Sequence, residues 1–169
     1  MTDSFLILGG ARSGKTRRAL ALADAMPSPI YLATAEARDG EMTDRIARHR
    51  AERGPHWRTV EEPLELAQVL RRETRPERAL LVDCLTLWLS NLMEAGRDIE
   101  AETRRLVQAL ADCPGRVILV SNEVGLGLVP ETPLGRAFRD AQGRLNQAVA
   151  ARVSTVEFIA AGLPLRLKG

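Results

Sequence analysis

Short apolar runs recur along the chain, and apolar residues with helical spacing separate most of them. The runs predict β-strands at 5–8, 29–33, 57–60, 79–83, 116–121, 155–160 and 164–167. Proline and glycine positions predict helices over 15–26 and 40–53, a helix that opens at Pro63, and a long helix from Pro133 through Arg152. Continuously apolar strands that alternate with helices indicate an α/β fold with a mostly parallel sheet covered on both faces.

The length of the chain agrees with a single domain. A chain of 169 residues is long enough to bury one sizeable core, and 45% of its residues are hydrophobic. No internal repeat, low-complexity tract or linker interrupts the pattern. We therefore expect one α/β domain that spans residues 1–169.

Charge and composition argue against several classes of function. The chain carries 24 basic and 22 acidic residues, for a net charge of +2, and only 4% of its residues are aromatic. This balance does not favour a nucleic-acid binder. The longest apolar stretch is interrupted by Asp83, so no membrane span is expected, and no secretory signal is expected because no basic region lies ahead of the first apolar run. Cys84 and Cys113 lack metal-binding or disulfide spacing and are expected to be buried thiols in a cytoplasmic protein.

A glycine-rich segment with the sequence GGARSGKT lies between the first predicted strand and the first predicted helix. It matches the phosphate-loop pattern G-x-x-x-x-G-K-[ST] in the structural context that the mechanism requires. Backbone N–H groups of such a loop surround a triphosphate, the lysine Lys15 reaches the β- and γ-phosphates, and the hydroxyl of Thr16 ligates Mg²⁺. The alternative is a glycine turn that merely precedes an amphipathic helix.

Asp83 is a candidate for the second metal-holding group. It ends the apolar run 79–82, which places a carboxylate at the carboxyl edge of a buried strand. Phosphate-loop enzymes hold Mg²⁺ with an aspartate at this place. The alternative is an aspartate that caps the helix after it. Because ligands bind beyond the carboxyl ends of parallel strands, the acceptor side is expected at 34–36, in the 40–62 region and at 122–125.

Both histidines of the chain lie in the segment DRIARHRAERGPHWRTVEE. On a helix, His49 would lie on the same stripe as Met42 and Ile46 and would face the protein. Arginines surround it in the sequence, and nearby cations lower the pKa of an imidazole, which leaves a neutral ring nitrogen able to act as a nucleophile. Periodicity alone favours a half-buried structural histidine instead. His56 is interpreted as packing at a strand start.

Taken together, the motifs resemble one enzyme family. The segments GGARSGKT, YLATAEARDGEMTDRIARHR, HWRTVEEP, LLVDCLT and LVSNEVGLGLVPETPLGRAFRDAQGRLNQAVA are similar to the bifunctional adenosylcobinamide kinase/adenosylcobinamide-phosphate guanylyltransferase family of cobalamin biosynthesis. The resemblance runs from the first predicted strand to AAGLPLRLK near the C-terminus. The segment SNEVGLGLVPETPLGRAFRD is far more particular than a phosphate loop.

The resemblance implies a RecA-like phosphate-loop fold and two successive reactions. A nucleoside triphosphate, ATP or GTP, would phosphorylate the corrinoid substrate adenosylcobinamide. GTP would then transfer GMP, through a guanylylated histidine, to adenosylcobinamide phosphate, giving adenosylcobinamide-GDP and pyrophosphate. The resemblance also implies a homotrimer. It implies no role that we can derive for Glu123 and Gly125–Gly127.

Carried over residue by residue, the family's nucleophile corresponds to His49, and Lys15 is the second candidate catalytic residue. The implied nucleotide-binding residues are Gly9, Gly10, Ala11, Arg12, Ser13, Gly14, Lys15, Thr16, Thr34, Ala35, Glu36, Arg50, Ala51, Glu52, Arg53, Glu61 and Asp83. Mg²⁺ would be held by Thr16 and Asp83. On sequence grounds alone, Glu61 is equally an acidic lead-in to the next helix.

Two other interpretations stay open at this point. One is a small-molecule kinase that transfers only the γ-phosphate, in which His49 is structural. The other is a RecA-like ATPase that serves as a motor or a binding module. The near-neutral charge and sparse aromatic residues speak against its nucleic-acid version, and the short chain speaks against its motor version.

Overall fold

A computed structural model describes residues 3–35 and 53–169, which contain one sheet with the strand order β3-β2-β4-β5-β1-β6-β7. The strands are β1 (Ser4–Gly9), β2 (Ile30–Ala33), β3 (Arg58–Glu61), β4 (Ala79–Asp83), β5 (Arg116–Asn122), β6 (Thr155–Ala160) and β7 (Leu163–Lys168). Every neighbouring pair from β3 to β6 is parallel, and only β7 runs antiparallel to its neighbour. The predicted mostly parallel α/β sheet is confirmed.

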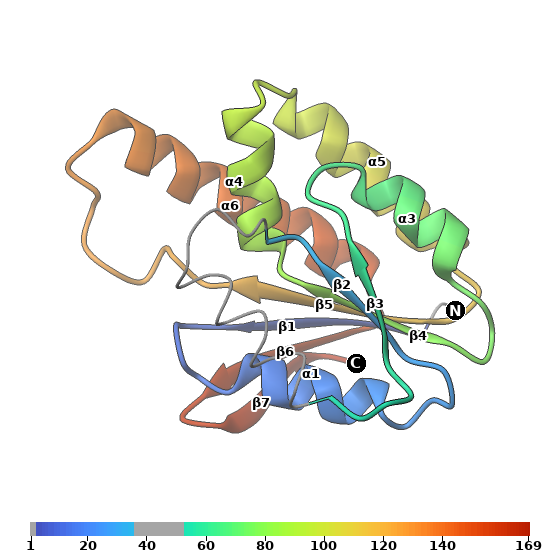
Figure 1. The fold of residues 1–169 in the computed structure, drawn as a ribbon. Helices are drawn as coiled ribbons and strands as arrows, with labels where there is room; N and C mark the ends of the chain where they lie inside the picture. The colour runs from blue at the N-terminus through green and yellow to red at the C-terminus, as the bar shows by residue number, and fades with distance from the viewer. Residues whose placement is uncertain (1–2, 36–52) are drawn as a thin grey trace.

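Helices cover both faces of this sheet (Figure 1). The helix α1 (Lys15–Ala23) lies on one face. The other face carries α3 (Leu66–Glu73), α4 (Leu85–Glu94), α5 (Ile99–Asp112) and α6 (Pro133–Arg152). In the described part of the chain, no helix has the length and apolarity needed to cross a bilayer.

Alternation along the strands divides the core between the two faces. In β1, Leu6 and Leu8 belong to the larger cluster with α3–α6, whereas Ile7 packs in the smaller cluster with α1. In β4, Leu80 and Leu81 divide between the clusters in the same way. Successive side chains of a strand point to opposite faces, so a continuously apolar strand is the pattern that two covered faces require.

Several element boundaries differ from the predicted ones. The first helix ends at Ala23, three residues before the prediction that it runs to 26. The helix after Pro63 begins only at Leu66 because the Glu62 carboxylate accepts hydrogen bonds from the backbone N–H groups of Leu64 and Glu65, at 3.0 and 2.9 Å, and holds a turn there. Nearly all of the helix predicted over 40–53 lies outside the described residues.

The direction of β7 follows from the turn before it. Ala161 and Gly162 join β6 to β7 with φ values of 50° and 80°. Two residues with positive φ make a tight hairpin turn, and a hairpin produces antiparallel strands. A parallel neighbour would need a crossover connection of about a dozen residues or more, which this turn does not provide.

An ion pair links α1 to β6. The Glu157 carboxylate, whose side chain is 2% exposed, accepts hydrogen bonds from Nε and a terminal nitrogen of Arg18 at 2.7 and 2.8 Å. Hydrogen bonding to Arg18 outweighs burial and holds the pKa of the Glu157 carboxyl below its usual value. A depressed carboxyl pKa stabilises the fold above the unfolded-state pKa, and this contribution is lost as the pH falls through the folded-state pKa.

We therefore expect Glu157→Gln to reduce the dependence of stability on acidity. The variant should be less stable than the wild type near neutral pH, and the difference should shrink below about pH 4.3, the usual glutamate pKa. Urea unfolding at a series of pH values between about 7 and 3 measures the free energy of unfolding of both proteins. Equal slopes against pH for the two proteins would contradict this account of the ion pair.

Candidate active site

The phosphate loop Gly9–Thr16 joins the carboxyl end of β1 to the start of α1. Its backbone needs glycine at two places. Gly14 has φ 101°, and a Cβ at Gly9 would lie 2.5 Å from the carbonyl oxygen of Ile159. The backbone N–H of Gly162 donates to the carbonyl oxygen of Ser13 at 2.8 Å, so the β6–β7 turn supports the loop from the side.

The loop and the helix after it are suited to hold an anion. Gly14 precedes α1, no side chain caps the helix, and its first turn contains no acidic residue. The first N–H groups of such a helix are available to phosphate oxygens. Lys15 is 7% exposed, and its Nζ donates to the carbonyl oxygen of Gly10 at 2.5 Å and lies 3.5 Å from Oγ of Ser13. Its positive charge is therefore held against the loop.

Thr16 and Asp83 lie together although 67 residues separate them in the sequence. Oγ1 of Thr16 donates to Oδ2 of Asp83 at 3.2 Å. Because β5 lies between β1 and β4 in the sheet, the loop after β1 and the end of β4 meet at one edge. The alternative role of Asp83 as a helix cap is wrong, since the residue before α4 is Cys84 and no side chain caps that helix.

This pair of oxygen ligands fits a magnesium ion. Mg²⁺ prefers hard oxygen donors and binds through one or two protein groups, water and substrate phosphates. Within residues 3–35 and 53–169, no group of three His, Cys, Asp or Glu side chains could hold a metal on its own. A nucleotide-dependent metal site with few protein ligands agrees with both observations, and the metal roles of Thr16 and Asp83 stay predictions.

Tyr31 extends this site and was not recognised from the sequence. Its hydroxyl donates to Oδ2 of Asp83 at 2.8 Å. The guanidinium of Arg53, one of the predicted nucleotide contacts, lies 3.6 Å from the centre of the Tyr31 ring. A nitrogen of Arg53 also donates to Oγ1 of Thr59 at 3.3 Å. The structure thus brings Arg53 close to the phosphate-loop side of the sheet.

Thr34, a predicted nucleotide contact, has a structural task at the end of β2. Its buried hydroxyl donates to the carbonyl oxygen of Cys84 at 2.8 Å and accepts from the Cys84 backbone N–H at 2.9 Å. The Asn91 side chain donates to the carbonyl oxygen of Thr34 at 2.8 Å. These bonds tie the end of β2 to the start of α4, beside Asp83. The thiols of Cys84 and Cys113 are buried and free, as predicted.

The other predicted residues divide into two groups. Glu61 ends β3 opposite Ala33 with an exposed side chain, and Ala35 follows β2. The remaining five lie outside the described residues, namely Glu36, His49, Arg50, Ala51 and Glu52. Their roles, the nucleophilic role of His49 included, stay predictions.

The end of β5 joins the same edge of the sheet. The backbone N–H of Glu123 donates to the carbonyl oxygen of Gly9 at 3.1 Å. Below it, the buried Ser121 hydroxyl donates to Oδ1 of Asn146 at 2.7 Å and accepts from Gln142 at 2.9 Å. The segment SNEVG therefore begins in contact with the phosphate loop. The only sequence signal for these bonds was that the polar residues Gln142 and Asn146 lie four apart within the apolar side of α6.

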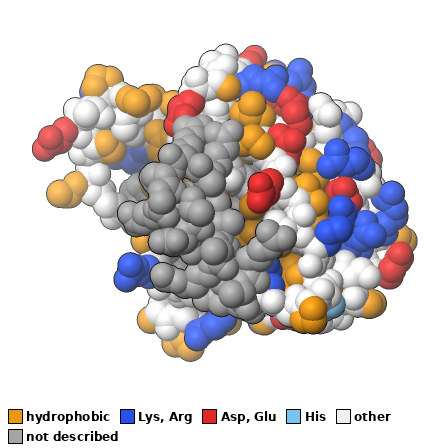
Figure 2. All heavy atoms as spheres, in the orientation of Figure 1, with side chains coloured by type: hydrophobic (Ala, Val, Ile, Leu, Met, Phe, Trp, Pro, Cys, Tyr) orange, Lys and Arg blue, Asp and Glu red, His pale blue; other side chains and the backbone are white. Residues whose placement is uncertain are grey.

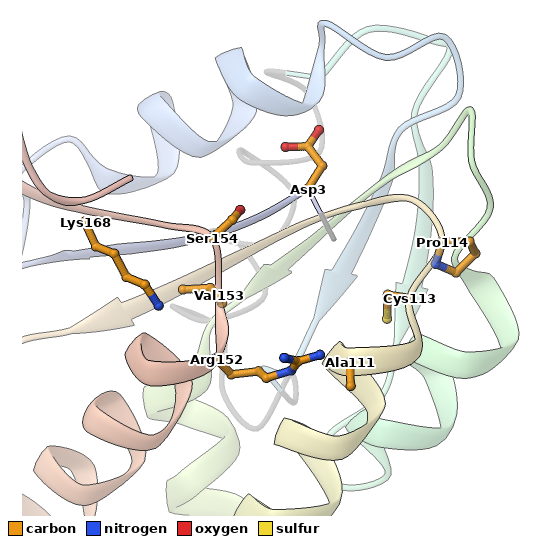
Figure 3. A pocket seen from close by; sticks show the side chains of 8 residues that line it. All are labelled: Asp3, Ala111, Cys113, Pro114, Arg152, Val153, Ser154 and Lys168. Atoms are coloured by element: carbon orange, nitrogen blue, oxygen red, sulfur yellow. The ribbon is translucent and has the colours of Figure 1, made fainter. Parts of the chain in front are cut away.

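A separate hollow lies at the opposite end of the sheet, before β1 and β6 (Figure 3). It has a volume of about 610 Å³. Its lining residues are Asp3, Ala111, Cys113, Pro114, Arg152, Val153, Ser154 and Lys168. None of them is a predicted site residue, and the predicted nucleotide site lies at the other edge of the sheet.

Comparison with known proteins identifies the family. The family model for cobinamide kinase / cobinamide phosphate guanyltransferase matches residues 5–167. The bifunctional adenosylcobalamin biosynthesis protein CobP of Pseudomonas aeruginosa is 54% identical over 167 residues, which cover 97% of this chain and 96% of the relative. The corresponding CobU protein of Escherichia coli is 39% identical over 178 aligned positions, covering 96% and 98%.

Solved structures agree with the fold. An ATPase from the type III secretion system of pathogenic bacteria matches with a TM-score of 0.62 at 11% identity, covering 97% of this chain and 56% of its own. The flagellar accessory protein FlaH from Methanocaldococcus jannaschii matches with a TM-score of 0.53 at 12% identity, covering 98% and 78%. The predicted RecA-like phosphate-loop architecture is thereby confirmed. On the match across nearly its whole length, this chain belongs to the cobinamide kinase / cobinamide phosphate guanyltransferase family.

Proposed function

We propose that this protein phosphorylates adenosylcobinamide and then transfers GMP from GTP, through His49, to the new phosphate. The products are adenosylcobinamide-GDP and pyrophosphate. The observation that carries the proposal is the phosphate loop with Thr16 bonded to Asp83 at 3.2 Å, in a chain that matches the family over residues 5–167. ATP or GTP serves as the phosphate donor in the first step.

In the first step, the terminal phosphoryl group moves from the nucleoside triphosphate to the aminopropanol hydroxyl of adenosylcobinamide. The hydroxyl oxygen forms the new P–O bond, the bond to the β-phosphate oxygen breaks, and the hydroxyl proton is released. Loop N–H groups and Lys15 hold the phosphates in line, since catalysis of this reaction is mainly positioning and charge stabilisation. Mg²⁺, held by Thr16 and Asp83, neutralises phosphate charge when it is bound.

In the second step, a ring nitrogen of His49 attacks the α-phosphorus of GTP, and pyrophosphate leaves. A phosphate oxygen of adenosylcobinamide phosphate then attacks the same phosphorus, which frees the histidine and joins GMP to the corrinoid phosphate. Attack at phosphorus builds negative charge, and fixed cations stabilise it. Arg50 and Arg53, which follow His49 in the sequence, are the cations that we assign to this task.

A homotrimer in the cytoplasm is part of the proposal. The surface that supports association is the segment between β5 and α6, which projects from the body of the molecule (Figure 1). Hydrophobic side chains gather on this projection (Figure 2). They include Leu126, Leu128 and Val129, which are 82%, 96% and 65% exposed, and Leu134 in the adjoining first turn of α6 is 69% exposed. Exposed apolar clusters of this kind are typical of contact surfaces.

Two labels in one substrate test the two reactions separately. Adenosylcobinamide is incubated with GTP labelled at the γ-phosphate in one sample and at the α-phosphate in another. The proposal predicts that γ-label appears in adenosylcobinamide phosphate and that both labels enter adenosylcobinamide-GDP. Product that carries only γ-label would contradict the transferase step and favour a small-molecule kinase in which His49 is structural.

A further inference from the structure

Tyr31 lies between two parts of the predicted nucleotide site. It is 6% exposed and belongs to β2, on the face of the sheet that packs against α1. Its hydroxyl donates to Oδ2 of Asp83 at 2.8 Å, and the guanidinium of Arg53 lies 3.6 Å from its ring centre. The Trp57 ring packs edge-on against the Tyr31 ring, with 6.5 Å between the two ring centres. A single side chain therefore contacts both the candidate metal ligand and a candidate nucleotide contact.

The hydroxyl of Tyr31 restricts the orientation of the Asp83 carboxylate. The last torsion of an aspartate is broad, so a carboxylate without fixed donors samples many orientations. In this protein Thr16 and Tyr31 both donate to Oδ2, at 3.2 and 2.8 Å. Both of these bonds use the same carboxylate oxygen, Oδ2. Tyr31 can keep its donor in place even when Thr16 turns to a metal.

The ring of Tyr31 holds the guanidinium of Arg53. A guanidinium over an aromatic face is attracted by the negative charge on that face, and the attraction is stronger where the ring is buried. Arg53 is further fixed by its bond to Thr59 at 3.3 Å. The charge of Arg53, which precedes β3 in the chain, is thus held on the same side of the sheet as Asp83.

We propose that Tyr31 is a positioning residue of the nucleotide site, whose hydroxyl orients Asp83 toward Mg²⁺ and whose ring orients Arg53 toward the nucleotide. The inference rests on the proposed function, because Mg²⁺ at Asp83 and GTP at Arg53 belong to it. The proposal predicts two separate effects. Loss of the hydroxyl should weaken Mg²⁺ binding, and loss of the ring should weaken nucleotide binding without metal.

Two variants distinguish these effects when GTP binding is measured by calorimetry. Tyr31→Phe removes only the hydroxyl. The Mg²⁺ concentration that half-saturates GTP binding should rise about tenfold to a hundredfold, the range expected for one hydrogen bond to a charged group, while GTP affinity in EDTA stays at the wild-type value. Tyr31→Leu removes the ring as well and should also lower GTP affinity in EDTA about threefold or more.

Trp57→Phe is the matched control. It removes the indole N–H bond to Asp24 at 2.8 Å in the same cluster and leaves Asp83 and Arg53 untouched, so both measurements should equal those of the wild type. A wild-type Mg²⁺ curve for Tyr31→Phe would overturn the role of the hydroxyl. An unchanged EDTA affinity for Tyr31→Leu, or for Arg53→Leu if the first variant does not fold, would overturn the role of the ring. Wild-type protein that binds no GTP would instead refute the proposed function itself.

Discussion

Replacing Lys15 by alanine is expected to slow phosphate transfer to adenosylcobinamide by about a hundredfold to a thousandfold, the usual cost of removing one fixed donor to a charged transition state. Lys15 is 7% exposed and its ammonium is held against the loop carbonyl of Gly10. In the proposed reaction, charge on the transferred group develops within reach of this ammonium, so the loss should fall mainly on kcat. The rate of γ-label transfer to adenosylcobinamide measures it.

The chain provides a matched control for this change. Lys168 is the only other lysine of the sequence and lies on β7, where its Nζ donates to the carbonyl oxygens of Ala150 and Ala151 at 2.9 and 3.0 Å. Lys168→Ala removes the same charge far from the loop and should leave kcat near the wild-type value. Lys15→Arg should not restore the rate, because a planar guanidinium does not replace a compact ammonium. Equal rates for Lys15→Ala and the wild type would contradict the assigned phosphate site.

Replacing His49 by alanine is expected to separate the two reactions. GMP transfer should fall below detection, since the covalent intermediate has no attachment point without the imidazole. Transfer of the γ-phosphate should continue within a fewfold of the wild-type rate, because the phosphate loop, Lys15 and Asp83 are unchanged. Chromatography of the products should therefore show adenosylcobinamide phosphate that accumulates and is not converted further.

His56 serves as the control for this variant. It is the only other histidine in the chain, its side chain is 50% exposed, and its Nε2 lies 3.3 Å from Oδ1 of Asp24, away from the phosphate loop. His56→Ala should form both products. If His49→Ala also completes the second reaction, the transferase mechanism is wrong.

The sequence predicted the layered sheet well because continuously apolar strands need to be covered on both faces. Strands buried on both faces, such as β4 and β5, were placed within a residue of their observed bounds. The direction of β7 was not predicted. It depends on positive φ values at Ala161 and Gly162, and Ala161 carries no signal for such a conformation. The start of α3 was missed because the Glu62 side chain diverts the backbone into a turn.

The site was predictable where a sequence motif implies a known arrangement of its residues. Thr16 of the phosphate loop bonds to Asp83; the motif made Thr16 a candidate in advance, and the end of the apolar run 79–82 made Asp83 one. Tyr31 was missed because it stands inside the apolar run PIYLA, where an aromatic residue reads as core. A buried tyrosine hydroxyl usually needs a polar partner, and that rule could have drawn attention to it. No sequence rule would have named Asp83 as the partner.

The covalent histidine intermediate is the central claim, and trapping it tests that claim most directly. Purified protein is incubated with GTP labelled at the α-phosphate and Mg²⁺, without corrinoid, then denatured and freed of nucleotide. We expect label that remains on the wild-type protein, is released by acid, survives alkali, and maps to the peptide that contains His49. The His49→Ala variant should retain none. Wild-type protein without label, or equal label on the variant, would contradict the account.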